Sequence, residues 1–382
     1  MRAFAKMLYS LGALVVLLTP FGVSPAESAR ATNGVLANTD QETLKLFLLG
    51  KQAFLRRRTA VDGLGPYFNA ESCSSCHHVP RPGGSGAPNN AVLMAAKVTG
   101  ADFDPLLGQG GPVFQKHMLP GFSPKVIPGY ANVRTRRVPP NLLGVGLIDE
   151  IPEEAILANA RNQPNEDGIR GRPNWVGGRL GRFGYKAQVA SIFEFMFQAE
   201  RDEIGITSPF SSGVVREVSA VADENSVPQP KVNAQEIFHL MYFVKWLAPF
   251  SPRYKGNVQS RGETVFKETG CAECHVPHFN TGPKKINAFD NIEARLYSDL
   301  LLHDMGDELA DKFEQGQAFG RDFRTTPLWG LSRKKYLLHD GRTTSMESAI
   351  NFHAGEATRV IQKYHHLSDD EKKALLTFLE SL

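Results

Sequence analysis

The chain has 382 residues, of which 42% are hydrophobic and 22% are charged, a balance that excludes a disordered chain, a collagen and a coiled-coil rod. Lys and Arg number 43 against 40 Asp and Glu, and the net charge of +3 is too small to support binding to nucleic acid. This length is sufficient for two or three domains that bury their own cores.

The N-terminus has the pattern of an export signal. Arg2 and Lys6 precede an apolar run that extends to Val23, and small residues follow at positions 25–29. We therefore expect residues 1–28 to be a cleaved signal peptide and the mature protein to be soluble and periplasmic. The alternative is an uncleaved membrane anchor, which is disfavoured because the run is shorter than the roughly 20 residues of a membrane span.

The first candidate functional motif lies near residue 75. Residues 50–54 (GKQAF) fit a helical pattern, and C-x-x-C-H follows at Cys73, Cys76 and His77. This order suits c-type haem, because two thiols three positions apart form thioethers to the porphyrin and the adjacent imidazole reaches the iron. We expect these three residues to hold a haem.

The segment between this motif and the second half of the chain is long and rich in loops. Residues 80–86 and 162–174 are dominated by Gly, Pro, Asn and other residues typical of loops, so strands are expected to be few and short. Residues 248–252 (APFSP) fit a linker.

The second half repeats the order of the first. Residues 262–266 (GETVF) precede a second C-x-x-C-H at Cys271, Cys274 and His275. The shared G-x-x-x-F pattern is similar to the opening helix of class I cytochromes c, in which the small Gly lets another helix cross closely. We expect the second motif to hold a second haem.

Each half also ends in a predicted amphipathic helix. Asn233 and Glu236 fit a capping box before the first of these helices, and Ser368 and Glu371 fit a capping box before the second. Each half therefore has an opening helix, a C-x-x-C-H motif and a closing helix.

The two motifs use all four cysteines of the chain. A four-cysteine zinc site is disfavoured because zinc ligand pairs usually lie within a few tens of residues, and a dithiol redox pair needs no second copy and no His. We therefore expect two covalently bound haem c groups. The predicted fold is mostly α, with cytochrome c-like domains at residues 29–252 and 253–382, long loops and few short strands.

Further segments resemble a known family. Residues 339–342 (HDGR) and 346–350 (MESAI) resemble a stretch of the bacterial di-haem cytochrome c peroxidases and the related MauG enzymes. Other segments look more like one branch of that superfamily, the di-haem oxidoreductases, also labelled thiol oxidoreductase-like: residues 68–70 (FNA), 181–187 (GRFGYKA), 301–306 (LLHDMG) and 353–357 (HAGEA). A thiol activity itself has little support, because both cysteine pairs are assigned to haem.

The resemblance implies a second iron ligand for the C-terminal haem. In the peroxidases this ligand stands fourteen residues after the His of HDG, which from His339 is His353. The peroxidases usually have Met there, so the chain departs from them toward a bis-His iron, which generally has a lower potential. The alternative is that His353 is a polar residue at a helix end.

The resemblance also implies catalytic residues at the N-terminal haem. Glu203 stands where the peroxidases have an acid–base carboxylate, and Tyr185 stands where they usually have a tryptophan between the haems. A carboxylate can take a proton from one peroxide oxygen and deliver it to the other. The alternatives are an ordinary solvated acidic patch of Glu200, Asp202 and Glu203, and a packing role for Tyr185. The glutamine that usually accompanies the carboxylate has no clear counterpart.

Several features stay open at this point. The sixth ligand of the N-terminal haem is not identified among Met94, His117 and Met118. Calcium, which related peroxidases hold between their domains, is unplaced, because residues 165–168 (NEDG) fail the EF-hand spacing. Arginines that are candidates for holding haem propionates, or are simply solvated, stand at positions 56–58, 134, 136 and 137.

The sequence therefore predicts an exported di-haem oxidoreductase, an enzyme that reduces hydrogen peroxide with electrons from a small donor protein, a cytochrome or a cupredoxin. The relatives suggest a homodimer. The alternatives are a non-catalytic electron-transfer cytochrome, and haem-based oxygenation or modification of an organic or protein substrate.

Overall fold

The computed structural model describes residues 34–206, 232–253 and 256–382. The predicted signal peptide at residues 1–28 lies outside this range.

The α-helices are α2 (Gln41–Leu55), α3 (Cys73–Cys76), α4 (Val145–Glu150), α5 (Glu153–Leu157), α6 (Ile192–Ala199), α8 (Ala234–Trp246), α9 (Asn257–Thr269), α10 (Met346–Asn351), α11 (Thr358–His366) and α12 (Asp369–Leu379). A π-helix, η4 (Glu200–Ile204), continues α6. The 3-10 helices are η1 (Ala60–Asp62), η2 (Pro88–Asn90), η3 (Leu107–Gln109), η5 (Cys271–Glu273), η6 (Asn287–Phe289), η7 (Leu331–Arg333) and η8 (Gly355–Ala357).

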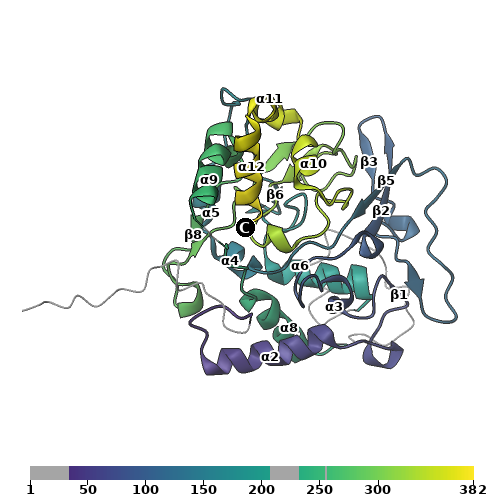
Figure 1. The fold of residues 1–382 in the computed structure, drawn as a ribbon. Helices are drawn as coiled ribbons and strands as arrows, with labels where there is room; N and C mark the ends of the chain where they lie inside the picture. The colour runs from purple at the N-terminus through teal and green to yellow at the C-terminus, as the bar shows by residue number, and fades with distance from the viewer. Residues whose placement is uncertain (1–33, 207–231, 254–255) are drawn as a thin grey trace, which may run out of the picture.

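Helices α2 and α8 pack against each other at one end of the molecule (Figure 1). They approach closely at Gly50, where an added Cβ would lie 1.9 Å from the carbonyl oxygen of His239. Asn233 caps α8 as predicted, because its side chain accepts a hydrogen bond from the Glu236 N–H. The Glu236 side chain does not complete the capping box, since its carboxylate binds Arg56 and Arg58 instead.

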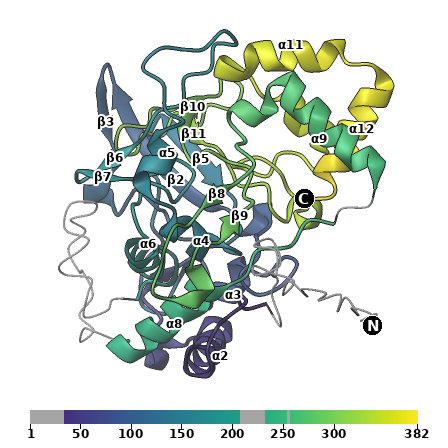
Figure 2. The ribbon, with the colours of Figure 1, turned by 90° about the vertical axis from the view of Figure 1, so that its left-hand side faces the viewer.

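Helices α9 and α12 form a second pair at the opposite end (Figure 2). Here an added Cβ on Gly262 would lie 2.1 Å from the carbonyl oxygen of Ala374. The predicted capping box of α12 is complete, with Ser368 and Glu371 bonded to each other's backbone N–H groups. The close helix crossing that the sequence predicts from G-x-x-x-F is therefore present in both halves.

The strands are short, as predicted. The largest sheet has the order β3-β2-β5 and is antiparallel, and Met94 of β2 lies opposite Thr135 of β5. Other strands form two-stranded ribbons. The strands are β1 (Tyr67–Phe68), β2 (Val92–Thr99), β3 (Asp102–Asp104), β4 (His117–Met118), β5 (Val133–Arg137), β6 (Trp175–Val176), β7 (Arg179–Leu180), β8 (Phe279–Asn280), β9 (Glu293–Ala294), β10 (Leu302–Asp304) and β11 (Asp322–Arg324). The expectation of a mostly helical protein with long loops is confirmed.

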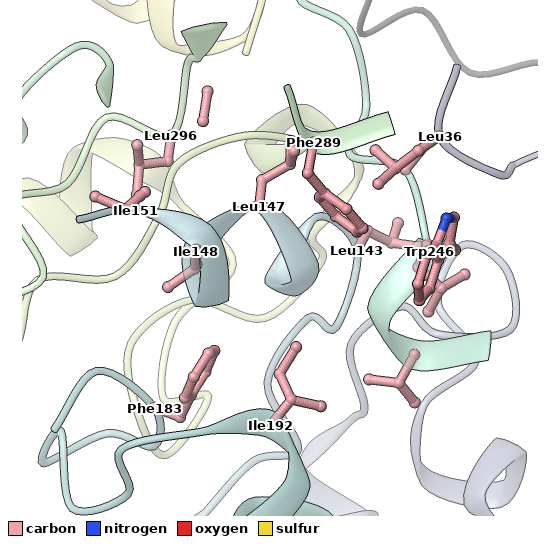
Figure 3. Close-up of a cluster of buried hydrophobic side chains, with 14 of the residues drawn as sticks. Leu36, Leu143, Leu147, Ile148, Ile151, Phe183, Ile192, Trp246, Phe289 and Leu296 are labelled. Carbon is pink, nitrogen blue, oxygen red and sulfur yellow. The ribbon is translucent and has the colours of Figure 1, made fainter. Parts of the chain in front are cut away.

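The main hydrophobic core combines residues of α2, α4, α6 and α8 with residues of the C-terminal half. Figure 3 shows α4 in the middle of this core, with Phe183 and Ile192 on one side and Trp246 and Phe289 on the other. The rings of Trp246 and Phe289 meet edge to face, with centroids 5.1 Å apart. These two residues come from either side of residue 252, so the two predicted units contribute to one core. The division into two haem domains stays a prediction.

The described helices were also compared with the requirements of a membrane span. Within residues 34–206, 232–253 and 256–382, no helix combines the length and the apolar character that crossing a bilayer needs.

Candidate functional site

The first C-x-x-C-H motif forms the short helix α3. Ser72 caps this helix by accepting a hydrogen bond from the Ser75 N–H. The Nδ1 atom of His77 lies 2.9 Å from the carbonyl oxygen of Pro140 and 3.2 Å from that of Gly84. Because Nδ1 donates to these carbonyls, Nε2 is the unprotonated nitrogen that is able to bind a metal. Burial lowers the pKa of His77 to about 4, so this imidazole is neutral at pH 7.

The second motif has the same arrangement. It begins at η5, and the Nδ1 atom of His275 lies 2.8 Å from the carbonyl oxygen of Tyr297. Burial lowers the pKa of His275 to about 4 as well. Both motif histidines therefore present a neutral Nε2, which is the form that binds iron.

The four cysteines of the motifs are not joined in disulfides. Burial raises the pKa of Cys73 and Cys271 to about 12 and that of Cys76 to about 11. Surroundings that disfavour a thiolate suit a thioether, which carries no charge. They do not suit a zinc thiolate site, and within the described residues no group of three or more His, Cys, Asp and Glu side chains is placed to hold a metal ion.

Both motifs open onto one cavity of about 530 Å³. Its volume is in the range of sites that hold cofactor-sized ligands. The structure places every residue that the sequence analysis assigned to haem binding or catalysis on the lining of this cavity: Cys73, Cys76, His77, Tyr185, Glu203, Cys271, Cys274, His275 and His353.

His353 lies beside His275, just after α10. The centres of the two imidazole rings are 6.5 Å apart. The Nδ1 atom of His353 lies 2.8 Å from the carbonyl oxygen of Ala349, so its Nε2 is also the unprotonated nitrogen. Two imidazoles that each bind one metal at about 2 Å would hold their ring centres about 6 Å apart, so the observed separation fits a shared iron.

Glu203 lies in the π-helix η4, close to the first motif. Its carboxylate accepts a hydrogen bond of 2.7 Å from the Asn69 side chain, and its backbone carbonyl accepts one of 2.7 Å from the Asn69 N–H. Burial raises the pKa of Glu203 to about 7. A π-helix often marks a functional site. Glu200 is buried, so the solvated patch considered for this segment is wrong for that residue. Glu203 and Asp202 are partly exposed, and Asp202 pairs with Arg201.

Tyr185 is buried and packs beside another cavity residue. Its hydroxyl donates a hydrogen bond of 2.8 Å to the carbonyl oxygen of Val138, and burial raises its pKa. Its ring centre lies 6.4 Å from that of His339, which in turn stacks on Phe323 at 4.5 Å. Tyr185, His339 and Phe323 therefore form a continuous group of rings along the cavity wall.

Two cations on the cavity lining have no acidic partner. Among the described residues, neither Arg324 nor Lys334 forms a salt bridge, and burial lowers the pKa of Arg324 to about 10 and that of Lys334 to about 8. Both side chains are partly buried, and the propionates of a haem would be suitable counter-ions for them. Sequence reasoning missed both residues, because they lie far from either motif in a segment without a local pattern.

The arginines considered for this role are mostly engaged elsewhere. Arg137 lines the cavity, but its guanidinium binds Asp311 at 2.7 Å. Arg134 and Arg136 are exposed on β5. The arginines at positions 56–58 form salt bridges with glutamates on the protein surface and at α8.

The open candidates for further ligands are placed as follows. Met94 lines the cavity, whereas His117 and Met118 are exposed on β4 and do not line it. His303 lines the cavity but is engaged, with Nε2 2.8 Å from Asp299 and Nδ1 2.7 Å from Glu356. The structure therefore makes His303 a structural residue beside Cys274 rather than an available iron ligand.

The segment with a calcium-loop appearance is also engaged. The Asp167 carboxylate binds Lys363 at 2.7 Å, and the Asn165 amide donates to Glu273 at 3.1 Å. These side chains stabilise the contact between residues 165–168 and the C-terminal helices.

The family comparison covers the second motif, His353, Tyr185 and Glu203. A family model described as "Di-haem oxidoreductase, putative peroxidase" matches residues 131–382, which is two thirds of the chain. The chain belongs to this di-haem oxidoreductase family. It is therefore an oxidoreductase enzyme that uses two haems. The first motif lies outside the matched region, so its assignment depends on its own residues and geometry.

Solved structures with detectable similarity include three proteins. Hydrazine synthase from Kuenenia stuttgartiensis is 12% identical and covers 99% of this chain and 100% of its own, with a TM-score of 0.45. A MauG-like protein associated with microbial copper homeostasis is 15% identical over 90% of each chain, with a TM-score of 0.42. The di-haem peroxidase BthA from Burkholderia thailandensis is 15% identical over 88% of this chain and 86% of its own, with a TM-score of 0.44. No curated protein matches the chain.

Proposed function

We propose that this di-haem oxidoreductase is an exported, periplasmic peroxidase that reduces hydrogen peroxide with electrons from a small donor protein. The haems are attached covalently, the first at Cys73 and Cys76 and the second at Cys271 and Cys274. Burial raises the pKa of all four thiols and so favours their uncharged form, which supports this attachment. The units that carry the haems are residues 29–252 and 253–382, and the matching crossings at Gly50 and Gly262 support that division.

The residues of the cavity divide into two groups with different tasks. His275 and His353 would hold the C-terminal iron, and Arg324 and Lys334 would neutralise haem propionates. His77 would hold the N-terminal iron near Glu203. When bound, the N-terminal haem supplies an iron that binds peroxide and accepts electrons.

The main support for the proposed peroxidase function is the carboxyl group of Glu203. Cleavage of the O–O bond requires that a proton leave one peroxide oxygen and reach the other, and a carboxylate near the iron can carry it. Such a group works best when its pKa is close to the working pH, and burial raises the pKa of Glu203 to about 7. The hydrogen bond from Asn69 holds the carboxylate next to the first motif.

Tyr185 has a supporting role in this proposal. Its ring lies in the group with His339 and Phe323 on the wall of the cavity that both motifs share. We propose that these rings assist electron transfer between the haems. Because the Tyr185 hydroxyl donates to the Val138 carbonyl, the ring is held in a fixed orientation.

The test is the variant Glu203→Gln, compared with Glu154→Gln, a variant of an exposed residue on α5. We expect Glu203→Gln to reduce the rate of peroxide reduction by about 100-fold and Glu154→Gln to leave it unchanged. In the wild type the rate should rise with pH through about 7, as Glu203 loses its proton, and the variant should lose this rise. Full activity and an unchanged pH profile in Glu203→Gln would contradict the proposal.

The alternatives predict other results in the same experiment. A non-catalytic electron carrier would not turn over peroxide in the wild type, although both haems would be reduced and oxidised by a donor protein. An oxygenase would consume dioxygen in the presence of an organic substrate.

A further inference from the structure

A second carboxyl group faces the cavity near the first motif. Glu200 is the first residue of the π-helix η4, only 7% of it is exposed, and it lines the cavity. Its Oε2 atom is buried and has no hydrogen-bond partner within the part of the chain that the structure describes. Buried carboxylate oxygens are normally paired, because an unpaired one loses its hydration without compensation. Glu200 therefore places a carboxyl group with incomplete hydrogen bonding on the lining of the cavity.

The neighbouring charges do not neutralise Glu200. Arg58 acts electrostatically on Glu200 and lowers its pKa, but the Arg58 guanidinium binds the Glu236 carboxylate and the Asp62 carbonyl oxygen. Glu236 itself disfavours a second negative charge at this position. On its own helix Glu200 has Arg201, which pairs with Asp202. Burial consequently raises the pKa of Glu200 to about 8, so the group holds a proton near neutral pH.

Glu200 and Glu203 both lie near the first motif. Glu200 acts electrostatically on Cys73, and Glu203 acts on Cys76. Glu203 is fixed by Asn69, whereas the Oε2 atom of Glu200 has no such partner among the described residues. The two carboxyls are therefore suited to different parts of one reaction.

The stoichiometry of peroxide reduction requires such a division. One hydrogen peroxide, two electrons and two protons give two water molecules. Glu203 moves a proton between the two oxygens as the O–O bond breaks, which supplies neither of the two additional protons. A second protonated group at the cavity is able to deliver them.

We propose that Glu200 is a second acid–base residue of the N-terminal haem site, which delivers protons from solvent to the reduced oxygen. This inference rests on the peroxidase function proposed above. For each proton delivered, the O–H bond of Glu200 breaks, a new O–H bond forms on the product water, and Glu200 takes a replacement proton from solvent. The two electrons come from the donor protein.

The test uses the holoprotein variants Glu200→Gln and Glu203→Gln, with Glu154→Gln as the control. The first readout is the infrared difference spectrum between the oxidised and reduced protein, which needs no peroxide. In the wild type and in Glu154→Gln we expect the C=O band of a protonated carboxyl to change on reduction. Glu200→Gln should lose the C=O signal of Glu200, and Glu203→Gln should keep that signal.

The second readout is the rate of cyanide binding to the ferric protein as a function of pH. Hydrogen cyanide must lose its proton to bind iron as cyanide, so the rate follows the ionisation of acid–base groups in the site. Glu200→Gln should lose the ionisation near pH 8 and keep the one near pH 7, and its peroxide turnover should fall about tenfold.

The outcomes separate this inference from the proposed function. If the wild type reduces peroxide and Glu200→Gln matches Glu154→Gln in the infrared band, the cyanide profile and turnover, the role of Glu200 is wrong. If the wild type does not reduce peroxide, the peroxidase function fails first and the role of Glu200 fails with it. If Glu200→Gln does not take up haem, Glu200→Asp, which keeps the acid, replaces it and should retain the band and at least a third of the turnover.

Discussion

The surroundings of His77 and His275 differ although the two motifs are the same. Each histidine donates from Nδ1 to a backbone carbonyl and each has a buried, neutral ring. Beside the second motif, His353 lies opposite His275, and Glu356 has a pKa lowered to about 2 by its hydrogen bond and charge interaction with His303. Beside the first motif, burial raises the pKa of the carboxyl groups of Glu200 and Glu203.

The two sites therefore share the residues of the motif, and they differ in the protonation of the acidic side chains around it. An acid that is ionised at every physiological pH cannot exchange protons, so Glu356 has a structural role next to the C-terminal haem. Carboxyls with a pKa near 7 or 8 do exchange protons. In the proposed function, proton-coupled chemistry therefore belongs to the N-terminal site.

Replacing His353 by Met should have the largest effect on the difference between the two sites. The C-terminal iron should change from two imidazole ligands to His and Met, and its reduction potential should rise by on the order of 0.1 V or more, within the about 0.8 V range that axial ligands span. A spectroelectrochemical titration measures this change. The control His366→Gln alters an exposed histidine on α11 and should leave both potentials unchanged. An unchanged potential in His353→Met would show that His353 does not bind the iron.

Replacing His303 by Gln tests the structural role of the second site. His303 and Asp299 are almost completely buried, and the variant would leave the carboxylates of Asp299 and Glu356 without their cation. We expect a loss of about 3 kcal/mol in the free energy of unfolding. The control Arg321→Gln removes an exposed salt bridge to Asp304 and should cost less than about 1 kcal/mol.

The pH dependence of this loss has a definite sign. Pairing raises the pKa of His303 well above 6.5, so its contribution is complete below that pH and declines as the pH rises through the folded-state pKa. The contribution of Glu356 is present above about 4.5 and is lost as the pH falls toward 2. Urea unfolding between pH 5 and pH 9 should therefore show the difference between wild type and His303→Gln shrinking at alkaline pH.

Alanine at Gly50 and at Gly262 tests the close helix crossing that the two halves share. At either position the new Cβ would overlap a backbone carbonyl of the crossing helix, at 1.9 Å and 2.1 Å. We expect each variant to lose about 2 kcal/mol of stability, measured by thermal unfolding of the holoprotein. Gly129→Ala is the matched control, since an added Cβ there meets no atom within 4 Å. A loss at only one of the two crossings would show that the halves are not built alike.

The sequence predicted the parts that follow a local pattern. The C-x-x-C-H motifs, the close crossings at Gly50 and Gly262 and the cap at Ser368 could all be inferred from residues a few positions apart. The capping box at Asn233 and Glu236 was predicted only in part. The Glu236 side chain does not complete it, because arginines far away in the sequence bind its carboxylate.

The other residues of the candidate site could not be predicted, because their positions depend on contacts between distant parts of the sequence. Arg324 and Lys334 belong to loops without a recognisable pattern, and their role follows only from the cavity that brings them to the motifs. The π-helix at Glu200 to Ile204 has no signature in the sequence, and it is the element that places Glu200 and Glu203 at the cavity. The difference in pKa between these two glutamates and the exposed acids elsewhere is a property of the fold.

The most direct test of the account is an EPR and visible titration of the holoprotein, oxidised and half-reduced, with cyanide and then with hydrogen peroxide. The account predicts that one iron is low-spin with two imidazole ligands and does not respond to cyanide. The other iron should be high-spin, or become so on half-reduction, bind cyanide and react with peroxide. Two irons that remain low-spin in both redox states and ignore both ligands would contradict the account and identify an electron carrier.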